Sequence, residues 1–475
     1  MSLTRKIAHN TIIQIVGKAI STIIALVVAS LLFRYLGKEG YGNYTTVMVF
    51  LQFFGIMVDM GLYIILTKKI SEAGADEESL VGNIFTIRLI SAVVFLGVAP
   101  LLVIFFPYPS VVKTGVALVS LSFLFVTLNQ VLQGVFQKHL KMMRVTISEI
   151  LGRLVLLAGT FLAVYLDQGL TTVLLVVVLS SFTNFLFTFI FSRKFVKIRL
   201  VFDFPVWRRI IKEAYPIALA ILFNLVYFKA DILILSLLKS QSDVGIYGAP
   251  FKILEVLVTF PAMFAGLAVP VLTQAFTAMD YERFRRVLSK SFDFLVMVAL
   301  PMIVGTIFIA EPVIDLIAGA DFVESGQVLQ ILIVTTGIIF IGNLFGNAVV
   351  VVNRQKEILK YYMAIAAISV GGCLLLIPRY SYIGAAWMTV VSQSLITLAT
   401  IYVVWRKTKI FPSLKFFTKA LIACTGMAVV LFLLKGFSLW ILVSAGIIAY
   451  GAILLLLKGI SKDLIKEIIA SPAKE

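Results

Sequence analysis

The chain has 475 residues, of which 61% are hydrophobic and 14% charged, and its mean hydropathy is +1.05. Soluble domains carry about 25% charged residues, so the composition excludes a soluble protein. Because lipid leaves backbone groups no outside partner and the apolar runs are long enough for helices, we predict an all-α polytopic membrane protein. The net charge of +17 comes from basic residues in short loops beside apolar runs. This pattern indicates contact with anionic lipids rather than with nucleic acid.

About fourteen apolar runs follow one another along the chain. Each is long enough to cross a hydrocarbon core of about 30 Å, which takes roughly 20 helical residues. We predict transmembrane helices at 11–33, 42–66, 84–106, 112–135, 146–166, 170–192, 213–238, 247–273, 291–313, 326–351, 358–377, 382–404, 416–435 and 438–457.

The basic residues are distributed unequally between the loops. When the loops are numbered in order, the two termini and the even-numbered loops hold 30 of the 41 Lys and Arg residues, and the odd-numbered loops hold 6. Since cytoplasmic loops concentrate Lys and Arg, we predict a multi-pass protein of the cell membrane with both termini in the cytoplasm. The segment MSLTRKIAHN continues into a full-length span without a small-residue cleavage site, which predicts a retained first helix.

A basic and aromatic interruption divides the chain. Residues 192–213 carry seven basic residues with Phe202, Phe204 and Trp207 between them, a composition typical of a segment at the membrane surface. The predicted domains are a six-helix bundle (1–192), a cytoplasmic linker (193–212), a second six-helix bundle (213–405), and two appended helices with a cytoplasmic tail (406–475).

The two bundles resemble each other weakly in sequence. A shift of 203 residues places Gly42 and Tyr44 on Gly245 and Tyr247, each after the first span of its half. A shift of 216 residues aligns the loops QKHLKMM and NRQKEIL, each after a fourth span. Six helices return the chain to its starting side, so the repeat is parallel. Parallel repeats are typical of transporters whose substrate path lies between the halves.

Three segments carry a resemblance to a known family. They are RYLGKEGYGNY (34–44), DILIL followed by VGIYGA (231–249), and NRQK followed by IPRYSYIGAAW (353–387). Together they resemble the polysaccharide flippases of the multidrug/oligosaccharidyl-lipid/polysaccharide exporter superfamily. The chain departs from that pattern at Lys38, where Pro is common, and at Asn353 and Ser381, where Gly is usual.

The resemblance implies a flippase that moves an undecaprenyl-diphosphate-linked oligosaccharide or polysaccharide repeat unit from the inner to the outer leaflet by alternating access. It implies a lipid-linked oligosaccharide and membrane lipids as partners, together with a polysaccharide polymerase and glycosyltransferases. A flippase for the peptidoglycan precursor lipid II is the nearest alternative, and a drug or cation antiporter of the same superfamily is more distant. A scaffold has no reason to keep unpaired cations in mid-membrane, and an integral glycosyltransferase usually needs a large outer loop.

Five cations fall inside predicted spans, where each costs about 2.5–3.5 kcal/mol or more. A lipid-linked diphosphate needs cationic groups along its path, and the attached sugar needs polar or aromatic ones. The candidate diphosphate- and glycan-binding residues are therefore Lys18, Arg88, Arg153, Lys229, Lys252, Asn224, Tyr227, Gln130 and Gln133.

For three of the cations a local structural role is the alternative. Arg88 lies near the start of its span and can extend to the interface. Arg153 follows Glu149 by one helical turn, and Lys252 precedes Glu255 by three residues, so that each can form an ion pair on its own helix.

Lys18 and Lys229 are the strongest candidates. Lys18 has no acidic residue within four positions, and Lys229 cannot share a helix face with Asp231, two residues away. An inter-helix ion pair is the alternative for Lys229.

Acidic residues inside the predicted spans have two possible roles. Asp59, Glu149, Asp231 and Glu255 are either ion-coupling groups or counter-charges for the cations. We find no nucleotide-binding loop, no nucleophile arrangement and no metal-ligand spacing, and both Cys373 and Cys424 lie in apolar runs. The sequence therefore predicts a non-enzyme without metal or cofactor. Its energy is expected to come from a gradient of H+ or Na+ or from consumption of the product.

The charge asymmetry makes a topological prediction. Reporter fusions at Ser240 and Ser381 should register outside the cell, and fusions at Ser289 and Lys407 inside. Paired alkaline phosphatase and fluorescent protein fusions provide the measurement. One reversed pair would contradict both the span count and the repeat.

Overall fold

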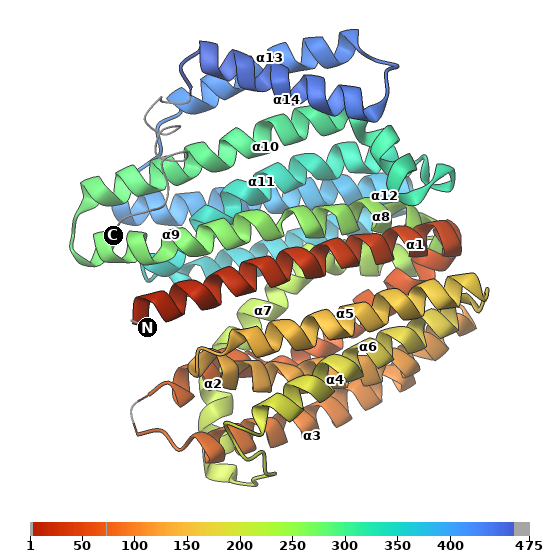
Figure 1. The fold of residues 1–475 in the computed structure, drawn as a ribbon, viewed down its shortest axis with the longest axis vertical. Helices are drawn as coiled ribbons and strands as arrows, with labels where there is room; N and C mark the ends of the chain where they lie inside the picture. The colour runs from red at the N-terminus through yellow and green to blue at the C-terminus, as the bar shows by residue number, and fades with distance from the viewer. Residues whose placement is uncertain (1–2, 73, 460–475) are drawn as a thin grey trace. The chain divides into compact units, whose positions relative to one another are not determined.

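The computed structural model describes residues 3–72 and 74–459, and throughout this part the regular structure is helical (Figure 1). The elements are α1 (Leu3–Asp59), α2 (Leu62–Ile70), α3 (Glu77–Val103), α4 (Ser110–Lys138), α5 (Met142–Tyr165), α6 (Gly169–Ser192), α7 (Phe204–Leu238), α8 (Gln241–Leu257), α9 (Thr259–Thr277), α10 (Tyr281–Ala318), the 3-10 turn η1 (Ala320–Phe322), α11 (Ser325–Val351), α12 (Gln355–Thr408), α13 (Lys415–Leu433) and α14 (Leu439–Leu456).

The fold class predicted from the sequence is confirmed. Within the described residues, 12 helical stretches are long and apolar enough to cross a membrane. Two of them, Ile13–Ile70 and Gln355–Thr408, have 58 and 54 residues, more than twice the roughly 20 that one crossing needs. Each is interrupted by a residue outside the helical region, Gly37 in one and Ser381 in the other. Each therefore holds two of the predicted spans, in agreement with about fourteen crossings.

Positive backbone angles explain two departures from the family pattern. Gly37 turns the chain at φ 62° and Ser381 at φ 47°, a region that favours glycine because it has no Cβ. The side-chain oxygen of Ser381 is also buried without a hydrogen-bond partner among the described residues. Asn353, at φ 56°, ends the turn after α11, and asparagine tolerates this conformation. Ser381 is therefore the more strained of the two replacements.

The chain forms two compact units. Unit 1 comprises Met1–Gly248 with Val370–Ala385, and unit 2 comprises Ala249–Ser369 with Ala386–Glu475. These units follow contacts between residues rather than the sequence repeat, so the predicted bundle boundaries stay a prediction. The predicted tail beyond residue 459 lies outside the described residues.

Two apolar cores of unit 1 join helices that are distant in sequence. One joins the second half of α1 to α3 and α4 through side chains such as Leu51 and Val116. The other joins α2, the start of α3 and the end of α4 to the first turns of α7, where Ile210 is buried. Helices α5 and α6 lie side by side (Figure 1), and Ser180 of α6 donates a hydrogen bond to the backbone of Gly152 in α5.

The predicted linker is anchored on α3 and is partly helical. The side-chain oxygen of Asn83 accepts hydrogen bonds from the backbone of Asp203 at 3.2 Å and from the indole of Trp207 at 2.8 Å. Helix α7 already begins at Phe204, because the Asp203 carboxylate accepts the backbone N–H of Val206 and a proline lies in the first turn. The second half of the predicted linker is thus the start of α7.

Unit 2 carries the last two helices on α10. Helices α13 and α14 pack against each other and against α10 (Figure 1). Their shared core includes Met427, Leu431 and Leu454. The hydroxyl of Tyr450 donates a hydrogen bond of 3.0 Å to the backbone carbonyl of Met297, which fixes α14 on α10.

The glycines matched by the repeat meet each other in unit 1. A Cβ on Gly42 of α1 would lie 1.7 Å from the carbonyl oxygen of Gln241, and a Cβ on Gly245 of α8 would lie 1.8 Å from that of Lys38. Each glycine therefore packs on the residue four positions before the other. This contact is reciprocal, as expected where equivalent helices of two repeats cross. Thr46 adds a hydrogen bond of 2.7 Å to the side chain of Gln241.

The second loop match needs a different register. Helices α4 and α11 end at Lys138 and Val351, while α5 and α12 begin at Met142 and Gln355. Both pairs of residues lie 213 positions apart, so the structural equivalence falls three residues from the predicted shift of 216.

The contact of Gly42 with α8 and of Gly245 with α1 (the glycine crossing) predicts that a larger side chain at either position destabilises the protein. We expect Gly42→Ala and Gly245→Ala each to lower the free energy of unfolding by about 1–3 kcal/mol, because the methyl group has no space beside backbone atoms. Gly97→Ala in α3 is the matched control, since a Cβ there meets nothing within 4 Å. The midpoint of thermal unfolding in detergent is the measurement. Equal midpoints for all three variants would show that the crossing is not tightly packed.

Candidate functional site

The break between α1 and α2 positions Asp59. This residue ends α1, and the next two, Met60 and Gly61, have positive φ angles of 44° and 72°. Gly61 approaches α7 so closely that a Cβ would lie 2.7 Å from the side chain of Ile217, directly after Pro216 within that helix. The carboxylate of Asp59 therefore lies at a fixed bend between two helices.

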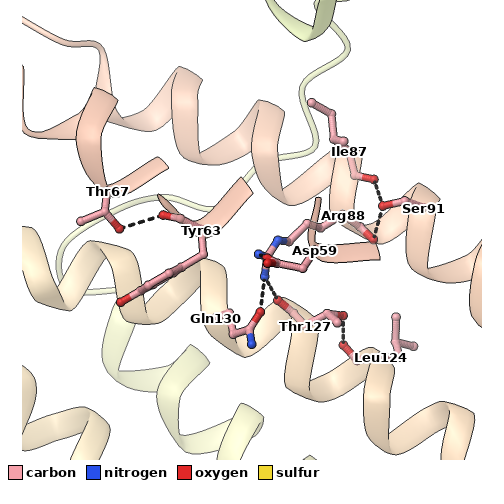
Figure 2. Close-up of polar contacts among 9 residues, drawn as sticks. All are labelled: Asp59, Tyr63, Thr67, Ile87, Arg88, Ser91, Leu124, Thr127 and Gln130. Carbon is pink, nitrogen blue, oxygen red and sulfur yellow. Dashed lines mark hydrogen bonds and ion pairs between the residues drawn. The ribbon is translucent and has the colours of Figure 1, made fainter. Parts of the chain in front are cut away.

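Arg88 of α3 points at this carboxylate (Figure 2). Its side chain has no solvent exposure, and its Nη2 forms an ion pair with the Oδ1 of Asp59. Its Nη1 donates hydrogen bonds of 2.6 Å to the backbone carbonyl of Thr127 and 2.9 Å to the side-chain oxygen of Gln130, both on α4. Three helices of unit 1 thus converge on one guanidinium group. Arg88 is buried and does not extend to the interface.

Physical chemistry explains why so many acceptors surround one cation. Removing a charge from water costs several kcal/mol, which only a close counter-charge and well-placed hydrogen bonds offset. The Asp59 side chain is 21% exposed, so the pair is open on the carboxylate side only. An anion could therefore reach Arg88 only after Asp59 or Gln130 had moved away from it.

Polar side chains continue from this cluster along α2 and α4. Tyr63 donates a hydrogen bond of 2.7 Å to the side chain of Gln137 and lies beside the ion pair in Figure 2. The side-chain oxygen of Asn129 is buried without a hydrogen-bond partner among the described residues. Gln133, one turn beyond Gln130, is half-buried. Of the predicted amides, Gln130 alone is shown in contact with a predicted cation.

A second polar cluster lies on α7 and α8. The hydroxyl of Tyr247 donates a hydrogen bond of 2.5 Å to the Asp231 carboxylate, whose other oxygen accepts the backbone N–H of Ile232. The Lys229 side chain is only 7% exposed. One turn earlier, Asn224 donates a hydrogen bond of 2.5 Å to the hydroxyl of Tyr227. Four of the predicted residues therefore lie together on α7.

The remaining candidates are more dispersed. Lys18 is exposed on α1. Lys252 forms an ion pair of 3.0 Å with Glu255 on its own helix, in agreement with the local alternative. Arg153 and Glu149 are both half-buried, and the structure, which describes both, shows no ion pair between them. Their roles in substrate binding stay predictions.

Sequence reasoning missed two tyrosines that form hydrogen bonds with α7. Tyr247 served to align the repeat and lies in the VGIYGA segment of the family resemblance, but it was not named as a candidate site residue. Tyr108, in the connection between α3 and α4, shares a hydrogen bond of 2.8 Å with Ser236 of α7. Burial raises the pKa of Tyr108 to about 12, although this hydrogen bond partly opposes the shift. The hydroxyl therefore stays protonated at physiological pH.

Among the described residues, no three His, Cys, Asp or Glu side chains are grouped to hold a metal ion.

The fold is shared with solved structures of a lipid II flippase and of a transporter of the MOP superfamily. The structure of the lipid II flippase MurJ in an inward closed conformation matches with a TM-score of 0.79 at 16% identity, covering 95% of this chain and 99% of that one. An inward-facing multidrug resistance MATE family transporter of the MOP superfamily matches with a TM-score of 0.68 at 14% identity, covering 84% and 97%.

The chain belongs to the polysaccharide biosynthesis protein family, whose model matches residues 7–276. The MatE family model also matches residues 216–375. Two curated relatives are each 21% identical to this chain: a probable flippase, AglR, of Haloferax volcanii, and the capsular polysaccharide biosynthesis protein CapF of Staphylococcus aureus. The matches cover 51% and 61% of this chain. The chain spans about half the length of the first relative (53%) and 74% of the second.

The buried ion pair predicts an asymmetric response to mutation. Asp59→Ala should lower the free energy of unfolding by about 3–5 kcal/mol, because it leaves the Arg88 charge buried without its counter-ion. The double variant Asp59→Leu/Arg88→Met should recover most of this loss, since both charges are removed together. Thermal unfolding in detergent measures both effects.

The control is a pair nearer the surface. Glu213, 37% exposed, pairs with Lys69 at 2.9 Å, and Glu213→Ala should cost at most about 1 kcal/mol. If Asp59→Ala is no more destabilising than Glu213→Ala, Asp59 is not the group that compensates Arg88.

Proposed function

We propose that the protein is a flippase that moves an undecaprenyl-diphosphate-linked oligosaccharide or polysaccharide repeat unit from the inner to the outer leaflet by alternating access. The observation that carries the proposal is the polysaccharide biosynthesis family match over residues 7–276, on a fold shared with a lipid II flippase. A transporter of this kind needs no catalytic residue, because no covalent bond of its substrate changes.

Buried cations support an anionic substrate. The diphosphate of a lipid-linked sugar must cross a region where an isolated charge is costly. Unit 1 places Arg88 and Lys229 among apolar helices with exposures of 0% and 7%. Lys229 lies two residues from Asp231, which accepts a hydrogen bond from Tyr247, and five residues after Asn224 on α7, whose amide offers hydrogen-bonding groups to a glycan. A cationic drug would instead favour an excess of carboxylates.

An apolar cavity in unit 2 supports a lipid-linked substrate. It has a volume of about 470 Å³ and lies between α10, α13 and α14. Its lining includes Met302, Ile309, Leu431 and Ile447. An isoprenoid chain carries no hydrogen-bonding group, so such a surface suits it better than a polar one.

The glycine crossing supports alternating access. Gly42 and Gly245 bring the backbones of α1 and α8 into contact, so at these two positions the helices can separate without withdrawing a side chain. Coupling to a gradient of H+ or Na+ belongs to the proposal as well. Among the four predicted acidic residues, Asp59 and Glu255 form ion pairs with cations, which favours counter-charge roles for these two, whereas Asp231 accepts a hydrogen bond from a tyrosine.

Lipid II transport is the second candidate, favoured by the structural match to MurJ. Both substrates carry a diphosphate on an isoprenoid, so the two functions differ in the glycan. Expression in a strain depleted of its own lipid II flippase separates them. Growth without surface polysaccharide would favour lipid II, and surface polysaccharide without rescue of growth would favour the first proposal.

The proposal predicts that Lys229 is needed for transport. Lys229→Ala should abolish surface polysaccharide in a complementation assay while leaving the amount of protein in the membrane unchanged. Lys229→Arg should restore part of the export, because the site needs a positive charge. Lys435→Ala, which removes an exposed lysine, is the control and should export normally. Normal export by Lys229→Ala, or loss of export only because the protein is missing, would assign the lysine a structural role.

A further inference from the structure

The two ends of α12 form a cationic pocket in unit 2. Because the chain folds back at Ser381, the first and last turns of this 54-residue helix lie together. Arg406 in the last turn contacts Glu357 in the first at 3.2 Å. Between these turns is a cavity of about 350 Å³, lined by Arg354, Glu357, Lys360, Val403, Arg406 and Lys407.

The charges of this pocket suit an oxyanion. Its lining carries four basic side chains and one carboxylate. Glu357 holds both arginines, at 3.4 Å from Arg354 and 3.2 Å from Arg406, so that the guanidinium groups lie on either side of one acid. Neither Lys360 nor Lys407 has a side-chain hydrogen bond or ion pair with the other described residues. Cations with free donors at the mouth of a cavity bind phosphate through charge-assisted hydrogen bonds.

Aromatic side chains indicate the depth of the pocket in the membrane. Tyr361, Tyr402 and Trp405 form a row with ring centroids 6.4 Å and 6.3 Å apart. Tyr402 and Trp405 are 44% and 41% exposed although they lie on an apolar helix. Tyrosine and tryptophan in such positions gather at the level of the lipid headgroups. The basic residues follow Trp405 directly, so their charges lie where lipid phosphates are.

We propose that this pocket binds the phosphate group of an anionic phospholipid in the leaflet on the predicted cytoplasmic side. The two lysines contact the phosphate, Glu357 keeps the two arginines apart, and the exposed aromatic rings border the upper part of the acyl chains. Its residues differ from those of the Arg88–Asp59 ion pair, and the proposal is independent of which glycan is transported.

The test measures lipid binding to the full-length protein in detergent by native mass spectrometry. Phosphatidylglycerol should bind Lys360→Gln/Lys407→Gln roughly thirtyfold more weakly than the wild type at its tightest site, since each basic residue near the headgroups contributes about a factor of five. Phosphatidylcholine should bind both proteins equally. Lys290→Gln/Lys415→Gln removes the same charge from exposed residues on the same predicted side and should leave the tightest phosphatidylglycerol site unchanged.

Other outcomes would overturn the proposal. Equal weakening by the control double variant would show a general effect of net charge. Inorganic phosphate that displaces phosphatidylglycerol at equal concentration would assign the pocket to a soluble anion. If the double variant unfolds, the single variants Lys360→Gln and Lys407→Gln decide the question, each with an expected loss of about fivefold. Unchanged binding in either would contradict the proposal.

Discussion

The cost of holding charge among apolar helices organises the interior of unit 1. A guanidinium group without solvent exposure requires a counter-ion and acceptors at hydrogen-bonding distance, and Arg88 obtains these from Asp59 and α4. The bend after Asp59, the closeness of α3 to α4 and the position of Gln130 all serve this one requirement. The same constraint explains why the Asp231 carboxylate is met by a tyrosine hydroxyl and a backbone N–H.

Much of the fold followed from the sequence because its signals are local. Hydropathy and length identified the helices, and the polar segment RYLGKEG separated the first two predicted spans. The sequence reasoning named no helix start between 193 and 212, although Asp203 followed by Phe204 and Pro205 is a helix-start signal. The same local reasoning gave mixed results for charges. Lys252 and Glu255 do pair on one helix, whereas Glu149 and Arg153 have the right spacing without pairing.

The candidate site was less predictable because its contacts join distant parts of the chain. Asp59 was predicted to be either an ion-coupling group or a counter-charge, and nothing in the sequence linked it to Arg88 rather than to another of the five cations. A hydrogen bond to a backbone carbonyl, such as that of Thr127, cannot be predicted from residue type, because every residue has a backbone carbonyl. Substrate roles for Lys18 and Lys229 depend on whether the substrate reaches them between the helices. Residue type and spacing identify these lysines as candidates but do not predict that contact.

The reciprocal contact of Gly42 and Gly245 has a consequence for how such a chain can change over generations. Where two identical six-helix halves associate as a symmetric dimer, the contact between them is isologous, and one substitution alters both sides at once. Joined in a single chain, the two sides vary separately, and here the repeat shift of 203 residues matches Lys38 with Gln241. The glycines themselves cannot diverge in this way, because each one faces the backbone of the other half, which stays the same under every substitution. The two glycines, which have no side chain, are therefore the positions of the repeat that tolerate substitution least.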